Sequence, residues 1–328
     1  MVGVSERSDL SDGEQERYRK IQNHNLPDAA IRRFLDDRDL NIPQGDDDFQ
    51  RSVAQQLSDE LVGELVQQYK YAGQQTLNYW ILTGVSEYDL DEIVESAKQE
   101  FPERDDVEGI PNDPFLADTE IKNTKLYMVY GFFTSTGGVE PVTGTPKSEL
   151  TTNRCVAVLH GGIDLLELRT SEPIIAKRIV EQIADALGGF KDSSRYQPAF
   201  DSGFQEVFND LVEKYTNLKV RVEDRENTTV DTISFTSRES ESGERKDARK
   251  DERVARELDE RGGEITIGYV QLNQGFRFQI NRKQAKISIM KHEREENINR
   301  ITQIINDVLR ETGGYTQSTL EEIENVPE

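Results

Sequence analysis

Apolar residues recur every three or four positions through the first hundred residues, which is the spacing of one face of an α-helix. Such stripes, together with capping residues, predict helices after Pro27, near Phe49, after Ser58, through Leu77 to Ile81, and after a capping box at Ser86. The residues before them are polar and aperiodic. We therefore predict a disordered tail over residues 1–13 and an N-terminal helical bundle over residues 14–100.

The pattern changes after residue 100. Residues 101–123 hold three prolines and many acids, and we interpret them as an acidic linker. Beyond them, alternation with period two predicts strands, and each group of three strands precedes an amphipathic helix. The predicted strands are 125–133, 154–160 and 163–169 before a helix from Pro173, and 264–272, 276–280 and 285–291 before a helix spanning Ile298 to Leu309. A turn-rich loop over 134–153 separates the first two strands.

The order strand, strand, strand, helix thus occurs twice, and both helices run into Gly-Gly-aromatic, at 188–190 and 313–315. We interpret this as an internal duplication. The alternative is two unrelated strand-helix units that share only a common way of ending a helix. The fold class is then α+β, with an N-terminal helical bundle followed by a duplicated antiparallel sheet and long-helix domain. We place that domain at 124–316, with repeat one at 124–190, repeat two at 230–315 and a tail at 317–328.

The segment between the two units has a different character. Residues 204–215 predict a helix, and 230–238 predict one more strand. A charged insertion, 238–262, follows, and its first 24 residues carry eight bases and nine acids. So few apolar positions predict a solvated helix or a flexible insertion, with a helix induced by a partner as the alternative.

The net charge of the chain affects how its basic residues are interpreted. The chain has 63 acidic and 40 basic residues, a net charge of −23, and only 15 of the bases are lysine. Scarce lysine and evenly spread carboxylates resemble the surfaces of halophilic proteins from salt-loving archaea, where salt screens the repulsion between carboxylates. An acidic total does not exclude a nucleic-acid partner, because attraction depends on the local field.

Composition also narrows the classes of chemistry. No apolar run is long enough to span a membrane and the first residues are charged, so we expect a soluble, cytoplasmic protein without a membrane partner. The single cysteine, Cys155, cannot form an internal disulfide, and with three histidines it cannot complete the usual zinc set. We expect Cys155 to pack in a strand, and His160 and His292 to be ordinary strand-end residues. No metal, cofactor or small-molecule substrate is predicted.

The strongest candidate for catalysis is the sequence GGIDLLELR, with Asp164, Glu167 and Arg169. A metal-dependent nuclease needs carboxylates that converge on a cation. In an extended strand, Asp164 and Glu167 are an odd number of positions apart and point to opposite faces. We therefore expect a protein that is not an enzyme and keep the nuclease as a third alternative.

A basic segment near the C-terminus is the clearest candidate for binding. Residues 276–292 carry five bases and no acid. If Phe278 and Ile287 pack inward, alternation turns the neighbouring cations to the opposite face, where they could meet phosphates. The alternative is that these bases pair with the protein's own acids. The candidate nucleic-acid-binding residues are Arg277, Arg282, Lys283, Lys286 and Lys291.

The run RCVAVLHGGIDLLELRTSEPIIAKRIVEQIADALGGF resembles a half repeat of the TATA-box-binding-protein fold: strand, tight glycine turn, strand, long helix and Gly-aromatic. The resemblance covers about 190 residues and implies a curved antiparallel sheet with its long helices on the convex side. This chain departs from the family in the charged insertion, and Asp164 and Glu167 occupy a strand that in the family contacts DNA. The family's insertion of apolar wedges into DNA is not carried over.

The overall layout, helical N-terminal domain then sheet, is similar to that of the centromere-protein-N family of kinetochore proteins, which bind DNA or nucleosomes and partner subunits. The first helices, LPDAAIRRFLDDRDLNI, also resemble the SAP module, a DNA-binding helix-loop-helix. Asp36, Asp37, Asp39 and Asp46 to Asp48 crowd its loop, where the module uses basic residues. No functional residue is carried over from either family.

These observations predict a non-enzymatic binding or adaptor protein that engages DNA or another nucleic acid through the basic β-hairpin. The alternative is a protein–protein adaptor or a self-associating scaffold module without nucleic-acid binding, since curved sheets and exposed strand edges hold partner chains.

Overall fold

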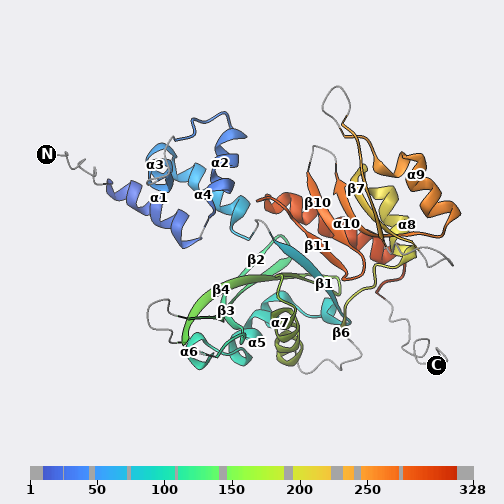
Figure 1. Cartoon of the computed structure of the whole chain (residues 1–328). Coiled ribbons are helices and arrows are strands. Elements are labelled where there is room, and N and C mark those ends of the chain that lie inside the picture. Colours follow the sequence, from blue (N-terminus) through green and yellow to red (C-terminus); the bar gives the residue numbers. More distant parts are fainter. Residues whose placement is uncertain are drawn as a thin grey trace. The chain divides into compact units, whose positions relative to one another are not determined.

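The computed structural model describes residues 10–24, 26–43, 49–71, 75–107, 110–139, 146–187, 195–222, 232–239, 245–272 and 276–315 (Figure 1). The chain divides into two compact units. The first contains residues up to 74 together with 289–301, and the second contains 75–288 together with the residues from 302 onward. In the described part of the chain, no helix is long and apolar enough to cross a membrane.

The first unit is helical. It contains α1 (Asp12–Asn23), α2 (Asp28–Asp36), α3 (Phe49–Gln56), α4 (Asp59–Tyr69) and the first residues of α10 (Glu295–Glu311). The helices surround one apolar core, in which Ile31, Phe34 and Leu65 are fully buried. The helices predicted after Pro27, near Phe49 and after Ser58 are therefore confirmed, and Ser58 caps α4 by accepting from Leu61 N. α1 begins at Asp12, inside the predicted tail, while Asp46 to Asp48 lie outside the described residues.

Ion pairs join the segment before α10 to α2 within this unit. Arg33 Nη1 lies 2.6 Å from Glu293 Oε1, and Arg294 pairs with Asp37. Glu293 is almost completely buried, so its carboxylate depends on the arginine for charge compensation. The acidic loop after α2 thus has a partner inside the protein.

The predicted helix through Leu77 and Ile81 is wrong, because these residues form strand β1 (Thr76–Leu82). Leu77, Tyr79 and Ile81 are buried on one face of that strand, and Leu82 is buried on the other. A strand covered on both faces shows no alternation, so periodicity cannot distinguish it from a buried helix. The helical unit therefore ends near residue 74, before the predicted boundary at 100.

The segment predicted as an acidic linker, 101–123, is also structured. It contains the short helix α6 (Arg104–Val107) and strand β2 (Phe115–Lys122). The predicted fifth helix exists as α5 (Leu90–Glu100), but it packs with the sheet of the second unit. Prolines before an edge strand, and acids before and on it, produced the appearance of a linker, because only one residue of this strand is buried.

The second unit is built on an antiparallel sheet, which among the described residues has eleven strands. Ten follow one path, in the order β2-β3-β4-β5-β1-β11-β10-β9-β7-β8, and β6 (Arg195–Tyr196) pairs with β1. The remaining strands are β3 (Lys125–Val139), β4 (Pro146–His160), β5 (Leu165–Arg169), β7 (Lys214–Arg221), β8 (Thr232–Thr236), β9 (Glu264–Gln271), β10 (Arg277–Asn281) and β11 (Lys286–Ser288). β1 lies between the two groups of strands that the sequence indicated.

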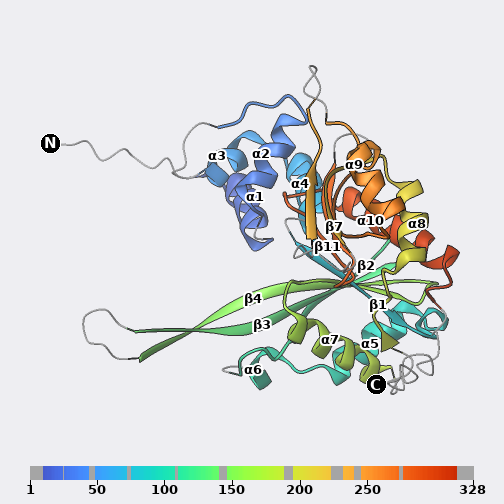
Figure 2. The ribbon, with the colours of Figure 1, turned by 45° about the vertical axis from the view of Figure 1, so that its right-hand side comes forward.

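Strands β3 and β4 are longer than predicted. They pair continuously from Lys125↔His160 to Val139↔Pro146, so most of the expected loop over 134–153 is β-structure. β2 pairs with β3 only as far as Gly131. Beyond this residue, β3 and β4 form a two-stranded ribbon that extends from the sheet (Figure 2). Threonine and serine favour strands locally, and the glycines among them made the segment resemble a turn.

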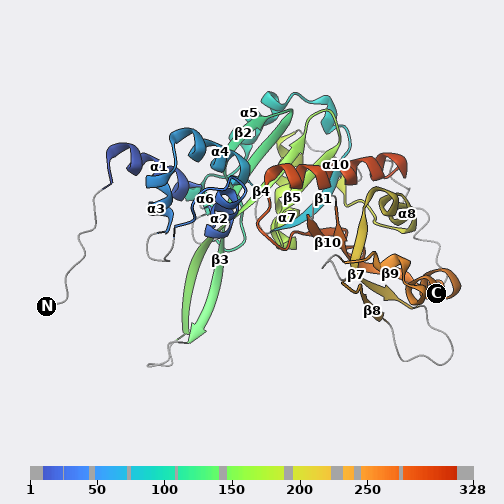
Figure 3. The same cartoon turned by 90° about the horizontal axis from the view of Figure 1, so that it is seen from above.

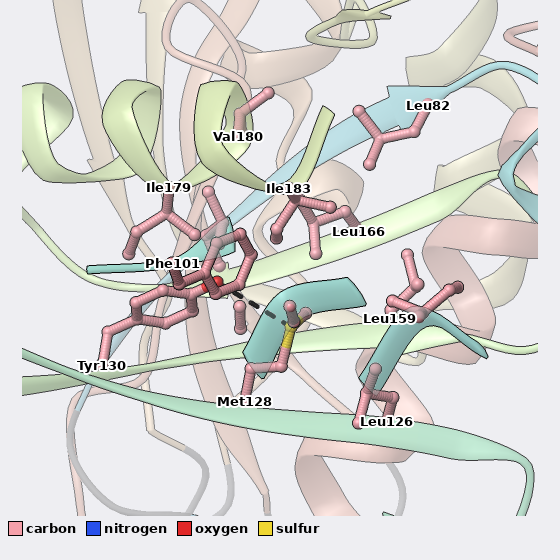
Figure 4. Close-up of a cluster of buried hydrophobic side chains, with 14 of the residues drawn as sticks. Leu82, Phe101, Leu126, Met128, Tyr130, Leu159, Leu166, Ile179, Val180 and Ile183 are labelled. Atoms are coloured by element: carbon pink, nitrogen blue, oxygen red, sulfur yellow. Dashed lines mark hydrogen bonds between the residues drawn. The ribbon is translucent and has the colours of Figure 1, made fainter. Parts of the chain in front are cut away.

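Helices cover opposite faces of the two halves of this sheet. α5 and α7 (Pro173–Ala186) pack on Leu166 and Leu168 of β5, together with Tyr130 and Met128 of β3 (Figure 4). On the opposite face of β5, Glu167 accepts a hydrogen bond from Thr302 of α10. The expectation from the TATA-box-binding-protein resemblance, long helices on one side, is therefore not met, because each half turns its apolar side to a different face.

The second half of the sheet carries α8 (Ser202–Leu211) and the later turns of α10 on one face (Figure 3). Phe204 and Phe208 of α8 stack with ring centroids 5.6 Å apart, and Phe208 meets Phe278 of β10 at 6.4 Å. The helix predicted at 204–215 is thus confirmed in part, and its last residues, from Lys214, begin β7.

The described end of the charged insertion is folded. It contains the turns η3 (Ala248–Lys250) and η4 (Arg256–Glu260) and the short helix α9 (Glu252–Ala255). Ala248 and Val254 are buried, so its few apolar residues are enough to attach it to the unit. Residues 240–244 of the insertion and the Gly-Gly-aromatic sequence at 188–190 lie outside the described residues. The internal duplication remains a prediction.

Gly131 offers a test of how β2 packs on β3. A Cβ atom at this position would overlap the ring of Phe115, whereas a Cβ at Gly137 of the same strand would meet nothing within 4 Å. We expect Gly131→Ala to lower the free energy of unfolding by about 1–3 kcal/mol through overpacking, and Gly137→Ala to leave it within about 0.5 kcal/mol. Urea unfolding of both variants measures this, and equal stabilities would show that Phe115 does not hold β2 in place.

Candidate nucleic-acid interface

The predicted basic hairpin is formed by β10 and β11, in the predicted orientation. Phe278, Ile280 and Ile287 are buried beneath the helices, and the register pairs Gln279 with Ser288 and Asn281 with Lys286. Arg277 is therefore on the same face as Lys286, away from the core. Hydrophobic alternation thus predicted correctly which side chains of the hairpin turn outward.

Arg282 does not extend from the hairpin as expected. Its Nε donates to the carbonyl oxygen of Phe200 at 2.8 Å, and its Nη1 donates to that of Ile265 at 3.0 Å. Burial lowers the pKa of Arg282. The guanidinium therefore anchors the turn to neighbouring segments, and it contributes less to an external surface than the sequence suggested.

The three lysines among the candidate residues differ in position. Lys283 is exposed in the turn of the hairpin and Lys286 is half-buried on β11. Lys291 is exposed but belongs to the first unit, so the structure does not place it beside the others. None of the three forms an ion pair with a carboxylate in the part of the chain that is described.

Residues of β7, β8 and β9 extend the outward face of the hairpin, and sequence reasoning missed them. The register places Asn217 opposite Tyr269, Lys219 opposite Ile267, and Arg221 opposite Glu264. On the other side, Tyr269 pairs with Gln279. The alternation of KYTNLKVR, with Asn217, Lys219 and Arg221 two apart, could have shown this face, but the predicted helix over 204–215 covered its first residues.

We define the open sheet face as the outward side chains of these five strands. It consists of Asn217, Lys219, Arg221, Thr232, Ser234, Thr236, Glu264, Ile267, Tyr269, Arg277, Gln279, Asn281, Lys286 and Ser288. Four of its members are cationic and one, Glu264, is anionic, in a chain whose total charge is −23. The local charge is thus opposite to that of the whole molecule.

This face has the groups that bind a polyanion. Lys219, Arg221 and Arg277 are exposed, and Arg277 is oriented by a hydrogen bond from its Nε to Gln271 Oε1 at 3.1 Å. Tyr269 lies half-buried between the basic strands, where a partly exposed ring can stack on a base. The hydroxyls and amides beside it can donate to phosphate oxygens.

The residues considered for a metal nuclease have structural partners. Asp164 accepts hydrogen bonds from the backbone N–H groups of Gly84 and Ser86, at 3.0 and 2.9 Å, and so closes the turn after β1. Glu167 and Arg169 are buried, and Arg169 Nε donates to Glu167 Oε1 at 2.5 Å. Within the described residues, no group of three or more His, Cys, Asp or Glu side chains could hold a metal ion.

Glu167 is the centre of a buried polar network. Thr302 donates to its Oε2, Tyr79 donates to the Thr302 hydroxyl at 3.2 Å, and His160 Nε2 lies 3.7 Å from Oε2. Burial by itself would raise the pKa of Glu167, but the charge of Arg169 and the nearby His160 and Thr302 outweigh it and hold the pKa well below its usual range. The carboxylate is therefore ionised inside the protein.

Cys155 behaves as expected, and the histidines differ from each other. Cys155 is buried in the core under α7, and burial raises the pKa of its thiol to about 12, which leaves it protonated. His160 ends β4 as predicted, but it faces the buried carboxylate of Glu167. His292 is partly buried in the first unit, and burial lowers its pKa.

Removing the charge of Glu167 tests whether the network stabilises the fold. Glu167→Gln leaves the buried Arg169 without its anion, and we expect it to lower the free energy of unfolding by about 3–5 kcal/mol. Glu181→Gln, which removes the partner of Lys177 on the surface of α7, should change it by less than about 0.5 kcal/mol. Urea unfolding followed by circular dichroism measures both, and similar small effects would contradict the role assigned to Glu167.

The same pair predicts a dependence on pH. Because the folded-state pKa of Glu167 is lowered, the stability it contributes is present at neutral pH and decreases as the pH falls below its ordinary value of about 4. The difference in unfolding free energy between the natural protein and Glu167→Gln should therefore shrink between pH 7 and pH 3, measured at constant salt. A difference that stays constant, or grows with acid, would show that Glu167 is not ionised in the folded state.

Comparison with known proteins adds no family to this description. No protein-family model matches the chain, and no curated protein matches it.

Proposed function

We propose that this protein is a non-enzymatic nucleic-acid-binding or adaptor protein and that the open sheet face is its binding surface. The observation that supports the proposal is the four-to-one excess of cations over anions on this face of a strongly acidic protein, with Lys219, Arg221 and Arg277 exposed. Carboxylates elsewhere on the molecule repel a polyanion, so it is directed to this face. Phosphate contacts would supply affinity, and Tyr269 would add stacking.

The arrangement favours single-stranded nucleic acid. The exposed cations lie on neighbouring antiparallel strands, and the aromatic ring lies between them. The face of a sheet can receive unstacked bases, whereas a duplex keeps its bases inside and offers only phosphates and groove edges. Lys283 in the hairpin turn extends the surface, and Arg282 supports the turn from inside.

The protein-adaptor alternative is supported by a different feature. Beyond Phe133, the ribbon of β3 and β4 pairs with no third strand among the described residues, and Leu150 is 45% exposed on it. Unpaired strand edges of this kind can add a strand from another chain. Association through the ribbon would not involve the cations of the open sheet face, so reversing their charge should leave it unchanged. This difference separates the two functions experimentally.

Salt-dependent binding tests the proposal. Four phosphate contacts predict that log K for a fluorescent 20-base oligonucleotide falls with log salt at a slope of about −3, and that Arg277→Glu with Lys219→Glu reduces this slope by about half. Fluorescence anisotropy measures both, across the salt range in which circular dichroism shows a folded protein. Lys98→Glu with Lys177→Glu, on α5 and α7, makes the same change of charge elsewhere and should leave the slope nearly unchanged.

Two outcomes would reject the proposal. The first is absence of binding at every salt concentration that keeps the protein folded. The second is an equal loss of affinity in the open-face variant and the control variant, which would show that only net charge matters. A partner that co-purifies with the protein and resists nuclease treatment would instead favour the protein adaptor.

A further inference from the structure

A second basic region lies at the edge of the same sheet. Lys214 at the start of β7, Phe235 and Thr236 at the end of β8, and several residues between 237 and 253 surround a hollow of about 750 Å³. Its size is within the range of small-molecule sites in proteins. β8 pairs only with Asn217 to Arg221, so the first residues of β7 are left beside the folded part of the charged insertion.

The lining of this hollow is rich in cations. It includes six basic side chains, which are Lys214, Arg238, Arg245, Lys246, Lys250 and Arg253, and three acidic ones, Glu213, Asp247 and Asp251. A net positive hollow is unusual in a chain with 63 acids and 40 bases. The question is whether the three carboxylates already neutralise it.

The carboxylates are engaged in holding the hollow together. Asp247 accepts from the backbone N–H of Tyr215 at 3.1 Å and pairs with Arg249, which is outside the lining. Asp251 accepts from Arg253 at 2.9 Å, and its hydrogen bonds with Arg253 lower its pKa to about 2. Both acids are therefore structural partners of particular arginines.

Three cations of the lining remain available. Arg238, Lys246 and Lys250 form no ion pair with a carboxylate among the described residues, and all three are exposed. Like charges gathered around one hollow repel each other, and an anion between them relieves this repulsion. Lysine and arginine together are the usual ligands of phosphate.

One part of the lining is apolar. The ring of Phe235 and the methyl group of Ala248 contribute to it, and Phe235 is only partly buried. A partly exposed aromatic ring next to unpaired cations is suited to a ligand that has both a flat ring and a phosphate chain. A purely inorganic anion would leave the ring without a role.

We propose that this hollow is a binding site for a small phosphorylated ligand with an aromatic ring, of the nucleotide class. Arg238, Lys246 and Lys250 contact its phosphates, and Phe235 stacks on its ring. The hollow and the open sheet face share Thr236, but the cations and the ring assigned to the ligand are not part of that face, so the site does not rest on the function proposed above.

Calorimetric titration of the full chain with ATP, AMP and tripolyphosphate, in buffer without divalent metal, tests this site. We expect ATP to bind more tightly than AMP, because it places more charge among the cations, and more tightly than tripolyphosphate, because only ATP has a ring. Lys246→Glu with Lys250→Glu should weaken ATP binding at least about tenfold. Phe235→Leu should weaken ATP but leave tripolyphosphate unchanged.

Controls separate this site from the open sheet face. Arg277→Glu with Lys219→Glu should reduce oligonucleotide binding and leave ATP binding unchanged, and circular dichroism confirms that each variant is folded. Failure of ATP to bind, or equal affinity for ATP and tripolyphosphate, would overturn the proposal. If ATP does not bind and Lys246→Glu with Lys250→Glu instead abolishes oligonucleotide binding, the hollow belongs to the nucleic-acid interface and the small-ligand assignment is wrong.

Discussion

The sheet of the second unit depends on the hydrogen bonding of β1 along both of its edges. β5 pairs with one edge and β11 with the other, so β1 joins two strands that are more than a hundred residues apart in the chain. Without it, both neighbours would expose unpaired N–H and C=O groups in the middle of the fold. Its side chains serve both faces: Tyr79 reaches Thr302 of α10, while Leu82 packs in the core under α7.

The ion pair of Glu167 and Arg169 explains how α10 is held on its face of the sheet. An ionised carboxylate in the interior needs charge compensation and hydrogen bonds, and Thr302 supplies one of them. A shift of the helix by one residue would turn Thr302 away and leave Glu167 underbonded. The same two residues that drew attention as possible catalytic groups thus have an internal structural task, and Asp164 has another in the turn after β1.

Charge is distributed unevenly over this acidic protein. The net charge of −23 is a sum over the whole chain, in which acidic residues dominate. It conceals two basic regions, the open sheet face and the hollow beside β8. Strand alternation places Lys219 and Arg221 of β7 on the open sheet face, whereas most cations of the hollow come from residues 238–253 after β8. Dense carboxylates keep a surface hydrated and also sharpen the contrast with these regions, because they repel a polyanion.

Local patterns in the sequence determined the helices of the first unit, most strands, and the outward direction of Arg277 and Lys286, because each follows from a period of 3.6 or 2. Several features could be decided only by the tertiary structure. Leu77 to Ile81 form a strand because sheet pairing and burial on both faces override a pattern that also fits a helix. Arg282 turns inward because its guanidinium donates to two carbonyl groups, those of Phe200 and Ile265, that are distant from it in sequence. Lys219 and Arg221 join Arg277 because the register of β9 brings their strands together, and register is a property of chain segments in contact that no single segment contains.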